Sequence, residues 1–311
     1  MPRKCGDNDY YGLEISRRPF YCDATSASMS LPRTRLGRVI SMRRLSARRV
    51  GEWALLASSV AAWTIGAAAT TISAASREGH LVLLGGGPTP AVVFTRTLNL
   101  SGGRSAMVAV LPQTYPNDSI GDAAVELWKK TGAREVFKLK LDDMDRARAD
   151  LERATLIWMP GGFQGLLMKT LAGTPIPDVI RRRFAEGATI GGASAGAAAM
   201  SATMIADEST PEGENPGGTR TMEGLGLWPA AIVSPHFTER RRSGPLVAII
   251  RDHPGLIGVG IDEGTAIFFS RGRLEVAGRG TITILDTANA PVRTLKAGDR
   301  LTLSDEGFPR R

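Results

Sequence analysis

One serine lies in a pattern typical of an activated nucleophile. Residues 192–196 read Gly-Ala-Ser-Ala-Gly, directly after an apolar run of strand length and directly before an alanine-rich segment. A sharp turn from strand to helix needs such small flanking residues to present the serine Oγ outward, and the helix that follows directs the positive end of its dipole at this oxygen. We therefore predict that Ser194 is a nucleophile. The alternative is a tight turn of small residues packed under a neighbouring helix.

A serine nucleophile needs a base within hydrogen-bond reach, usually a histidine, and the chain contains three histidines. His80 opens an apolar run at its amino end, and His253 precedes a proline in a turn that ends a helix. His236 instead follows an expected strand, as the glycine-rich turns of the chain do. Position and elimination together indicate His236 as the base, against the alternative of a structural histidine.

The sequence leaves the third member of a Ser-His-acid triad open. The Asp262-Glu263 pair ends an expected strand, and other acids follow the serine more closely in the chain: Asp207, Glu208, Glu212 and Glu214. We favour Glu263, because it leaves its strand on the side where the serine and the histidine are expected. The alternative for any of these residues is an ordinary surface acid.

Acyl transfer also needs two backbone N–H groups that hold an oxyanion. Ala195, the residue after the serine, supplies one, and the Gly-Gly pair at 161–162 is the natural source of the other, so we expect Ala195 and Gly162 in this role. Gln164 in the same loop is a candidate for orienting the substrate, or else a polar residue at the start of a helix.

Three consecutive arginines, residues 240–242, follow the predicted base within a few positions. Such a run is usually a solvated helix face. Its closeness to His236 nevertheless indicates that one or two of these side chains bind a substrate carboxylate through paired hydrogen bonds.

The elements that must position these residues alternate between strands and helices. Near-continuous apolar runs, typical of buried parallel strands, cover residues 80–84, 106–111, 155–159 and 188–190. Segments with helical periodicity lie between or after them, at residues 120–130, 144–153, 177–185 and 195–204. This alternation predicts an α/β fold with a doubly wound, mostly parallel sheet.

Past residue 256 the pattern changes to short strands with turn signals. These strands are expected at residues 256–261, 265–269, 273–276, 281–285 and 300–303. Each is too short to bury a core by itself, so we expect an antiparallel extension of the same domain. In an open α/β sheet, ligands bind beyond the carboxyl ends of the strands. Three glycine clusters (85–87, 161–162 and 191–192) fall at such ends and predict one shared pocket, where backbone N–H groups can approach a substrate.

Composition excludes several classes of protein. The 311 residues are 42% hydrophobic and 23% charged, which excludes global disorder. The net charge of +8 is concentrated in residues 1–50, which hold 11 of the 39 Lys and Arg but only 4 of the 31 Asp and Glu. The nearly neutral remainder offers no broad surface for a phosphate backbone, so we expect no nucleic-acid partner. Both cysteines, Cys5 and Cys22, also lie in the first segment. The remainder therefore has no thiol nucleophile, internal disulfide or cysteine metal site, and we expect no metal or organic cofactor.

The first 78 residues are predicted to be a basic leader, followed by a single domain over residues 79–311. Residues 53–76 carry no charge, an arginine-rich segment precedes them, and Ser73-Ala74-Ala75 offers small residues for cleavage. We expect a signal for export to the periplasm or the extracellular space, with translation starting at Met42 or Met29. The alternative is an uncleaved extension, with the protein cytoplasmic or attached to a membrane through this leader.

Five collinear pieces carry a resemblance to a known family. They are the glycine turn 85–87, the loop 160–164, the sharp turn 192–197 around Ser194 (the nucleophile elbow), His236-Phe237 with Arg240 and Arg242, and the segment 260–266. In these residues the chain resembles the cyanophycinase and dipeptidase E group of serine peptidases, whose fold is the flavodoxin-type fold of class I glutamine amidotransferases. The pieces span residues 80–285 or so.

The resemblance implies that Ser194 is the nucleophile, that His236 is the base and that the loop 160–162 supplies an oxyanion donor. For the acid it leaves the same alternatives open, because the acids after the elbow and the Asp-Glu pair both have counterparts in the family. It also implies a peptide substrate with an aspartyl or other acidic residue, bound by Arg240 or Arg242, and it allows a homodimer. Cyanophycinases carry Asp-Gln before the histidine and a further Arg after the two that match. Here these positions are Ser234-Pro235 and Pro245, so cleavage of the cyanophycin polymer is a separate question from serine-peptidase chemistry.

Three other classes of protein share parts of the pattern. A glutamine amidotransferase needs a thiolate at the elbow, and no cysteine follows residue 22. In an esterase of the α/β-hydrolase type, the histidine comes last after several further strands, whereas here strands are expected beyond His236. A binding protein that keeps the pocket but has lost turnover is the remaining alternative.

Overall fold

The computed structural model describes residues 78–206, 209–210, 213–214, 220–286 and 293–303. The predicted leader, with its apolar run and both cysteines, lies outside these residues up to position 77. In the part of the chain that the structure describes, no helix is both long and apolar enough to cross a membrane.

The larger of two main sheets has eight strands in the order β16-β13-β12-β1-β5-β4-β2-β3. Its five parallel strands are β1 (Leu81–Leu84), β2 (Met107–Val110), β3 (Glu135–Lys138), β4 (Leu156–Met159) and β5 (Thr189–Ala193). Three antiparallel strands extend it beside β1, namely β12 (Thr265–Ser270), β13 (Arg273–Gly278) and β16 (Arg300–Thr302). The predicted mostly parallel sheet and its antiparallel extension are confirmed.

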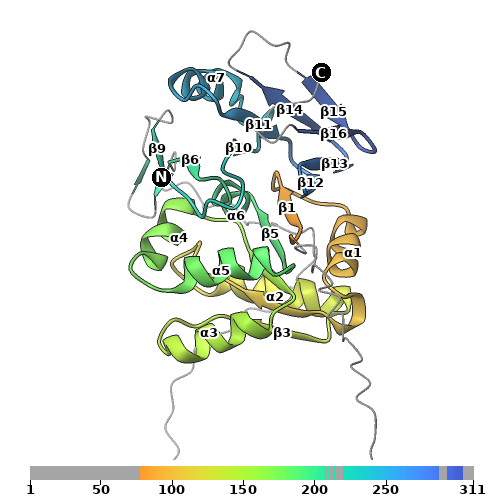
Figure 1. The fold of residues 1–311 in the computed structure, drawn as a ribbon, viewed down its shortest axis with the longest axis vertical. Coiled ribbons are helices and arrows are strands. Elements are labelled where there is room, and N and C mark those ends of the chain that lie inside the picture. The colour runs from red at the N-terminus through yellow and green to blue at the C-terminus, as the bar shows by residue number, and fades with distance from the viewer. Residues whose placement is uncertain (1–77, 207–208, 211–212, 215–219, 287–292, 304–311) are drawn as a thin grey trace, which may run out of the picture. The chain divides into compact units, whose positions relative to one another are not determined.

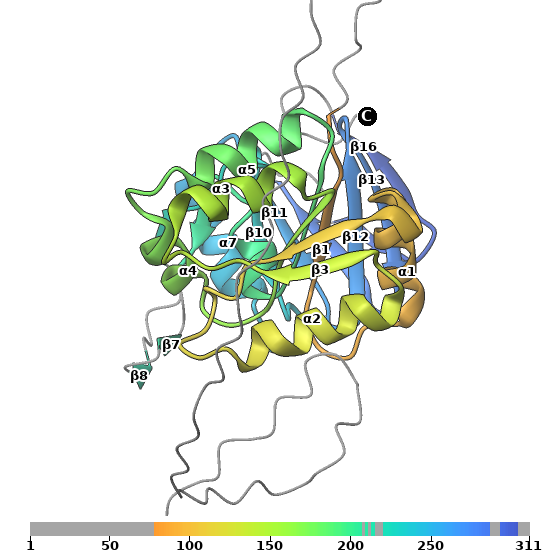
Figure 2. The ribbon, with the colours of Figure 1, turned by 90° about the horizontal axis from the view of Figure 1, so that it is seen from below.

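Helices cover both faces of this sheet (Figure 2). On one face lie α1 (Ala91–Leu100) and α2 (Ser119–Thr131), and on the other lie α3 (Met144–Arg153), α4 (Gln164–Leu171) and α5 (Ile176–Ala185); a 3₁₀ turn, η1 (Gly103–Ser105), precedes β2. Successive strand residues face opposite layers, so Val82 and Leu84 pack with α1 and α2, whereas Leu81 and Leu83 pack in the core that includes α3, α4 and α5. The sheet is therefore doubly wound, as expected.

A second, four-stranded sheet contains β10 (Ala231–Pro235), β11 (Ile257–Ile261), β14 (Thr281–Leu285) and β15 (Arg293–Lys296), in that order. The crossover helix α7 (Ser243–Asp252) packs on this sheet and joins β10 to β11, which are parallel. The run at 256–261, expected in an antiparallel extension of the domain, forms β11, which is antiparallel to β14 but parallel to β10. The chain passes between the two sheets from β11 to β12 and from β13 to β14, and a short apolar run does not reveal which sheet it will join.

The predicted helix at 195–204 is wrong in its second half. Helix α6 covers only Ala195–Ala198, and β6 (Thr203–Ile205) follows, paired with β9 (Thr221–Glu223). The carbonyl oxygens of Ala199 and Met200 accept N–H groups from residues 225, 227 and 228, so a distant segment takes the bonds that would continue the helix. A small hairpin of β7 (Ser209–Thr210) and β8 (Gly213–Glu214) lies between β6 and β9 in the chain.

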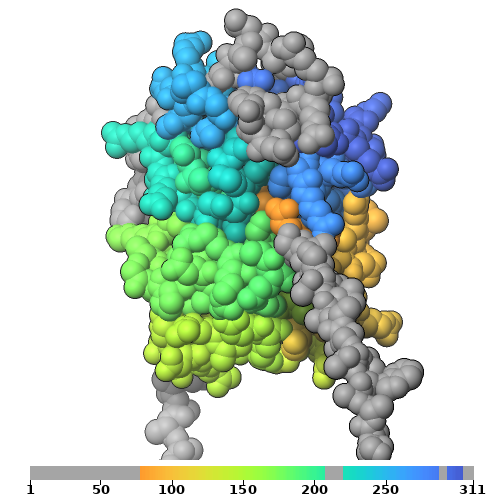
Figure 3. Space-filling view, viewed as in Figure 1, coloured from red at the N-terminus to blue at the C-terminus, as the bar shows by residue number. Residues whose placement is uncertain are grey.

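The two sheets meet where β5, β10 and β11 end (Figure 1). In the space-filling view, the teal segment, which includes β10, lies directly above the green segment, which includes α5 (Figure 3). The main hydrophobic core includes side chains from both sheets, among them Leu83 and Ile190 of the first and Val259 and Ile282 of the second. The turns that leave β5, β10 and β11 carry the predicted site residues.

Candidate active site

Ser194 lies in a sharp turn between β5 and α6. Its backbone has φ 51° and ψ −113°, an unfavourable region for a residue other than glycine, and its N–H donates to the carbonyl oxygen of Leu84 at 2.9 Å. The two flanking glycines permit this turn. A Cβ on Gly196 would lie 2.1 Å from the carbonyl oxygen of Met159, and a Cβ on Gly192 would lie 2.5 Å from the backbone of Gly196. The predicted sharp turn from strand to helix is thus present, and close contacts explain both of its glycines.

His236 lies directly after β10 and meets the serine. Its Nε2 is 2.8 Å from Ser194 Oγ, and its own N–H donates to the carbonyl oxygen of Gly85 at 2.9 Å. The residue is buried and has a positive φ of 49°, so the backbone at both Ser194 and His236 is strained. Gly86 packs against the imidazole, since a Cβ there would lie 2.4 Å from Cε1 of the ring.

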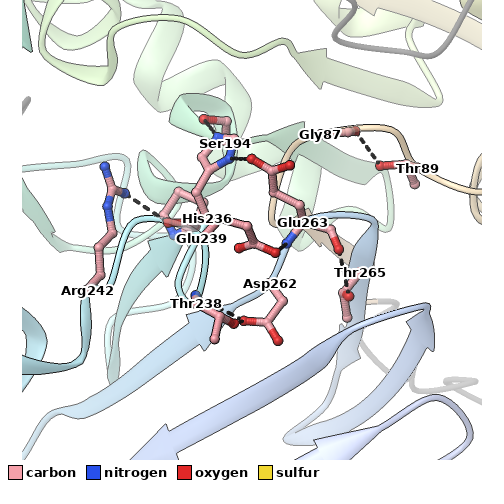
Figure 4. Close-up of polar contacts among 11 residues, drawn as sticks. Gly87, Thr89, Ser194, His236, Thr238, Glu239, Arg242, Asp262, Glu263 and Thr265 are labelled. Carbon is pink, nitrogen blue, oxygen red and sulfur yellow. Dashed lines mark hydrogen bonds and ion pairs between the residues drawn. The ribbon is translucent and has the colours of Figure 1, made fainter.

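Glu263 completes a chain of hydrogen bonds with these two residues (Figure 4). It follows β11, and its Oε1 lies 2.6 Å from His236 Nδ1. A Cβ on Gly87 would lie 2.4 Å from Oε2 of Glu263. The glycine turn 85–87 was expected to bring backbone N–H groups to a substrate. In the structure the glycines of this turn allow His236 and Glu263 to pack closely against the end of β1.

Asp262, the other acid of the pair, takes no part in this chain. Its Oδ1 accepts the N–H of Thr238 at 3.2 Å and also the Thr238 hydroxyl, and its Oδ2 accepts the N–H of Thr281 at 3.0 Å and the Thr281 hydroxyl at 2.7 Å. Burial opposes ionisation of Asp262, but these hydrogen bonds outweigh it and hold the pKa of the carboxyl below its usual value. Asp262 therefore ties the turn after His236 to β14.

The structure does not describe the side chains of the other candidate acids. Asp207, Glu208 and Glu212 lie outside the described residues, and Glu214 is described only as part of β8. The remaining histidines lie elsewhere. His80 precedes β1 at the opposite end of that strand, and His253 lies 3.5 Å from the Thr221 hydroxyl at the end of α7. His236 is thus the histidine that the structure places against Ser194.

The surroundings of His236 favour its neutral form. Burial lowers the pKa of the imidazole most, and the positive charge of Arg240 lowers it further, whereas the hydrogen bond and the charge of Glu263 raise it. Arg242 adds a smaller lowering contribution, and the net result is a pKa below the usual value for histidine. A neutral imidazole can accept the serine proton at neutral pH.

The two expected oxyanion donors lie at the first turn of α6 and in the loop after β4. Neither the Ala195 nor the Gly162 N–H donates to an acceptor within the described part of the chain. The close contact of Gly196 with Met159 brings the end of β4 against the turn that contains Ser194. Gly162 lies three residues after Met159 and has a φ of 137°. Thr114 fixes this loop, because its carbonyl oxygen accepts the Phe163 N–H at 2.7 Å and its hydroxyl donates to the carbonyl oxygen of Gly161 at 2.8 Å.

The three expected substrate-binding side chains differ in their surroundings. Gln164 Nε2 donates to the carbonyl oxygen of Ile205 at 3.0 Å, which links α4 to β6. Arg242 is half-buried, and its Nη1 donates to the carbonyl oxygen of Pro235 at 2.9 Å, so it braces the residue before His236 (Figure 4). Arg240 is exposed, and its N–H donates to the carbonyl oxygen of His236 at 3.0 Å. Arg240 is therefore the arginine of this pair whose side chain faces solvent beside the base.

Sequence reasoning missed two residues next to this site. Glu239 Oε1 accepts the N–H of Glu263 at 3.1 Å, and Thr238 binds Asp262 as described above. Both belong to the turn after His236 and are exposed. No local pattern indicates them, because their partners lie 24 positions further along the chain.

Comparisons with known proteins identify the family of the chain. The model of peptidase family S51 matches residues 81–277. The cyanophycinase of Geminocystis herdmanii is 37% identical over 204 residues, which are 62% of this chain and 74% of that protein. The cyanophycinase of Synechococcus elongatus is 35% identical over 228 residues, or 70% of this chain and 71% of that one.

Solved structures support the fold. A peptidase from an acI-B1 actinobacterium superposes with a TM-score of 0.58 at 24% sequence identity, and the match covers 73% of this chain and 98% of that one. The family match spans the strands that carry Ser194, His236 and Glu263. The chain belongs to peptidase family S51 and is a serine-type peptidase.

Proposed function

We propose that this peptidase cleaves an amide bond through an acyl-enzyme, with Ser194 as nucleophile, His236 as general base and Glu263 as the acid of the triad. The observation that carries the proposal is the continuous chain from Ser194 Oγ to His236 Nε2 at 2.8 Å and from His236 Nδ1 to Glu263 Oε1 at 2.6 Å. Each residue comes from a different strand end, and the serine lies in a strained turn before a helix. This arrangement matches the roles that acyl transfer requires.

The mechanism follows from these contacts. His236 Nε2 accepts the proton of Ser194 as Oγ attacks the substrate carbonyl, and Glu263 stabilises the imidazolium that forms. The N–H groups of Ala195 and Gly162 hold the oxyanion. The imidazolium then gives its proton to the leaving amine, and a water molecule, activated by the same imidazole, releases the acyl group. No step requires a metal ion or an organic cofactor.

The substrate in this proposal is a peptide with an aspartyl or other acidic residue next to the scissile bond. The cyanophycinase relatives support this class of substrate. Arg240 supports it as well, because it places a cation next to His236 and is exposed. A guanidinium binds a carboxylate through two parallel hydrogen bonds. Arg242 contributes less directly, since one of its nitrogens is already bonded to Pro235.

The first experiment is labelling with a serine-reactive fluorophosphonate probe, beside a Ser194→Ala control. We expect the native protein to be labelled and the control to remain unlabelled. Absence of labelling in a folded sample would contradict the proposed mechanism and favour a binding protein on the same fold.

The second experiment tests the substrate class. Aspartyl dipeptides, the cyanophycin polymer and neutral dipeptides are compared as substrates of the native protein and of Arg240→Ala. We expect Arg240→Ala to raise KM for acidic substrates more than for neutral ones. An equal change in KM for both classes would contradict the role of Arg240 in binding an acidic residue.

A further inference from the structure

The acid and the base of the site are held by two neighbouring loops that exchange hydrogen bonds. The loop after β10 contains His236, Thr238 and Glu239, and the loop after β11 contains Asp262 and Glu263. The Asp262 carboxylate accepts the backbone N–H of Thr238, and in the other direction the Glu239 carboxylate accepts the backbone N–H of Glu263. Figure 4 shows the two contacts on adjacent residues of each loop.

This exchange matters because few hydrogen bonds hold Glu263. Apart from His236 and Glu239, its described partner is the Thr265 hydroxyl, which donates to its carbonyl oxygen. Within the described residues, the Glu263 carboxylate has one hydrogen-bond partner, the imidazole of His236. Its side chain is 34% exposed, whereas that of His236 is 4% exposed. The orientation of the carboxylate toward Nδ1 therefore depends on how the Glu263 backbone is held, and Glu239 holds its N–H.

The two halves of the exchange differ in burial. Asp262 is 8% exposed and accepts four hydrogen bonds, two from Thr238 and two from Thr281, so it belongs to the packed interior. Glu239 is exposed, and Glu263 is its one hydrogen-bond partner within the described part of the chain. Replacing Asp262 would disturb the packed interior, whereas replacing Glu239 removes the acceptor of one exposed hydrogen bond.

We propose that Glu239 is a positioning residue for the triad, which holds the backbone of Glu263 so that its carboxylate stays directed at His236. The proposal rests on the proposed function. It requires no contact between Glu239 and the substrate. A site in which the acid can turn away from the base loses catalytic rate and keeps its affinity for substrate.

The test compares Glu239→Ala with Glu239→Gln in the full-length protein, on the best peptide substrate identified. Loss of the acceptor in Glu239→Ala is expected to lower kcat about two- to tenfold with KM unchanged. Glu239→Gln keeps an acceptor oxygen at the same place and should restore kcat. A matched control is Glu223→Ala, which removes an exposed acid on β9 and should leave kcat unchanged.

A double-mutant cycle shows whether Glu239 acts through Glu263. In a Glu263→Ala background, the change Glu239→Ala should have no further effect on kcat, because no carboxylate remains to be positioned. A kcat in Glu239→Ala equal to that of the native protein would overturn the proposal, as would an equal loss in both backgrounds or a change confined to KM.

The pH profile provides a readout that a merely structural role would not move. Glu263 raises the pKa of His236, so a loosened contact should shift the acid limb of kcat/KM to lower pH in Glu239→Ala and not in Glu239→Gln. Failure of this proposal is distinguishable from failure of the proposed function. An unchanged rate in Ser194→Ala would overturn both the proposed function and the positioning role. If Ser194→Ala loses activity and Glu239→Ala keeps its full activity, the positioning role alone is overturned.

Discussion

At the scale of single residues, the charges around His236 determine when it can act as a base. Burial and Arg240 lower the pKa of the imidazole, and Glu263 raises it, with a net lowering. Because the folded-state pKa lies below the unfolded value, His236 remains neutral at neutral pH and gains its proton only on acidification. The peptidase should therefore be active at neutral pH and lose activity as the pH falls through the folded-state pKa.

Replacing Arg240 tests this balance. In Arg240→Ala a positive charge near the imidazole is lost, so the pKa of His236 should rise and the acid limb of kcat/KM should move to higher pH. The measurement is kcat/KM as a function of pH. The position of its acid limb reports the pKa of the base in the free enzyme, so it is separate from any change in substrate affinity. The control is Arg241→Asn, which removes the neighbouring charge and suits the positive φ of 51° at that position. A limb that stays in place in Arg240→Ala, or moves as far in the control, would contradict this reading.

The sequence indicated Ser194 and His236, the proposed nucleophile and base, for different reasons. Ser194 lies in a local pattern whose steric logic can be read directly, and His236 was one of three histidines, placed by its strand. The acid could only be favoured, because Asp262 and Glu263 are adjacent and a strand end does not reveal which side chain turns toward the histidine. Glu239 was missed because its role depends on the approach of two loops.

At the scale of elements, the elbow depends on the close approach of α6 to β4. A Cβ on Gly196 would lie 2.1 Å from the Met159 carbonyl oxygen, which is a backbone atom and not the end of a flexible side chain. Strands β4 and β5 beside this contact were predicted from their apolar runs, whereas the short length of α6 was not predicted. Alanine favours helix, but bonds from residues 225–228 end the helix after one turn.

A pair of glycine substitutions separates this steric requirement from helix propensity. Gly196→Ala should lower the free energy of unfolding by about 1–3 kcal/mol, because the new methyl group overlaps the Met159 backbone. Gly244→Ala in α7 meets no atom within 4 Å and should raise the free energy by about 0.4–1 kcal/mol. Urea denaturation of both variants provides the measurement. If Gly196→Ala were as stable as the native protein, the elbow would not be under this constraint.

At the scale of the whole described domain, the residues of the proposed triad are divided between the two sheets. Ser194 follows β5 of the larger sheet, and His236 and Glu263 follow β10 and β11 of the smaller one. The parallel part of the larger sheet was predictable because apolar runs alternate with amphipathic helices. The division of the C-terminal strands between two sheets was not, because each run is short and its partners lie far away in the chain.

One core that spans both sheets should make them unfold together. Ile257 of β11 is fully buried in the same cluster as Leu83 and Ile190 of the larger sheet. Ile257→Ala leaves a cavity and should lower the free energy of unfolding by about 2–5 kcal/mol. Native-state hydrogen exchange should show the same loss of protection for the slowest amides of β4 as for those of β14, since both open only in global unfolding.

The matched control for this experiment is Val92→Ala on α1, a side chain that is 67% exposed and should change protection in neither sheet by more than about 0.5 kcal/mol. If Ile257→Ala lowered protection in β14 and left β4 unchanged, the smaller sheet would be a separate unfolding unit. The base and the acid could then leave the serine without loss of the larger sheet. The same protection loss in both sheets would instead mean that the geometry of the triad is as stable as the fold itself.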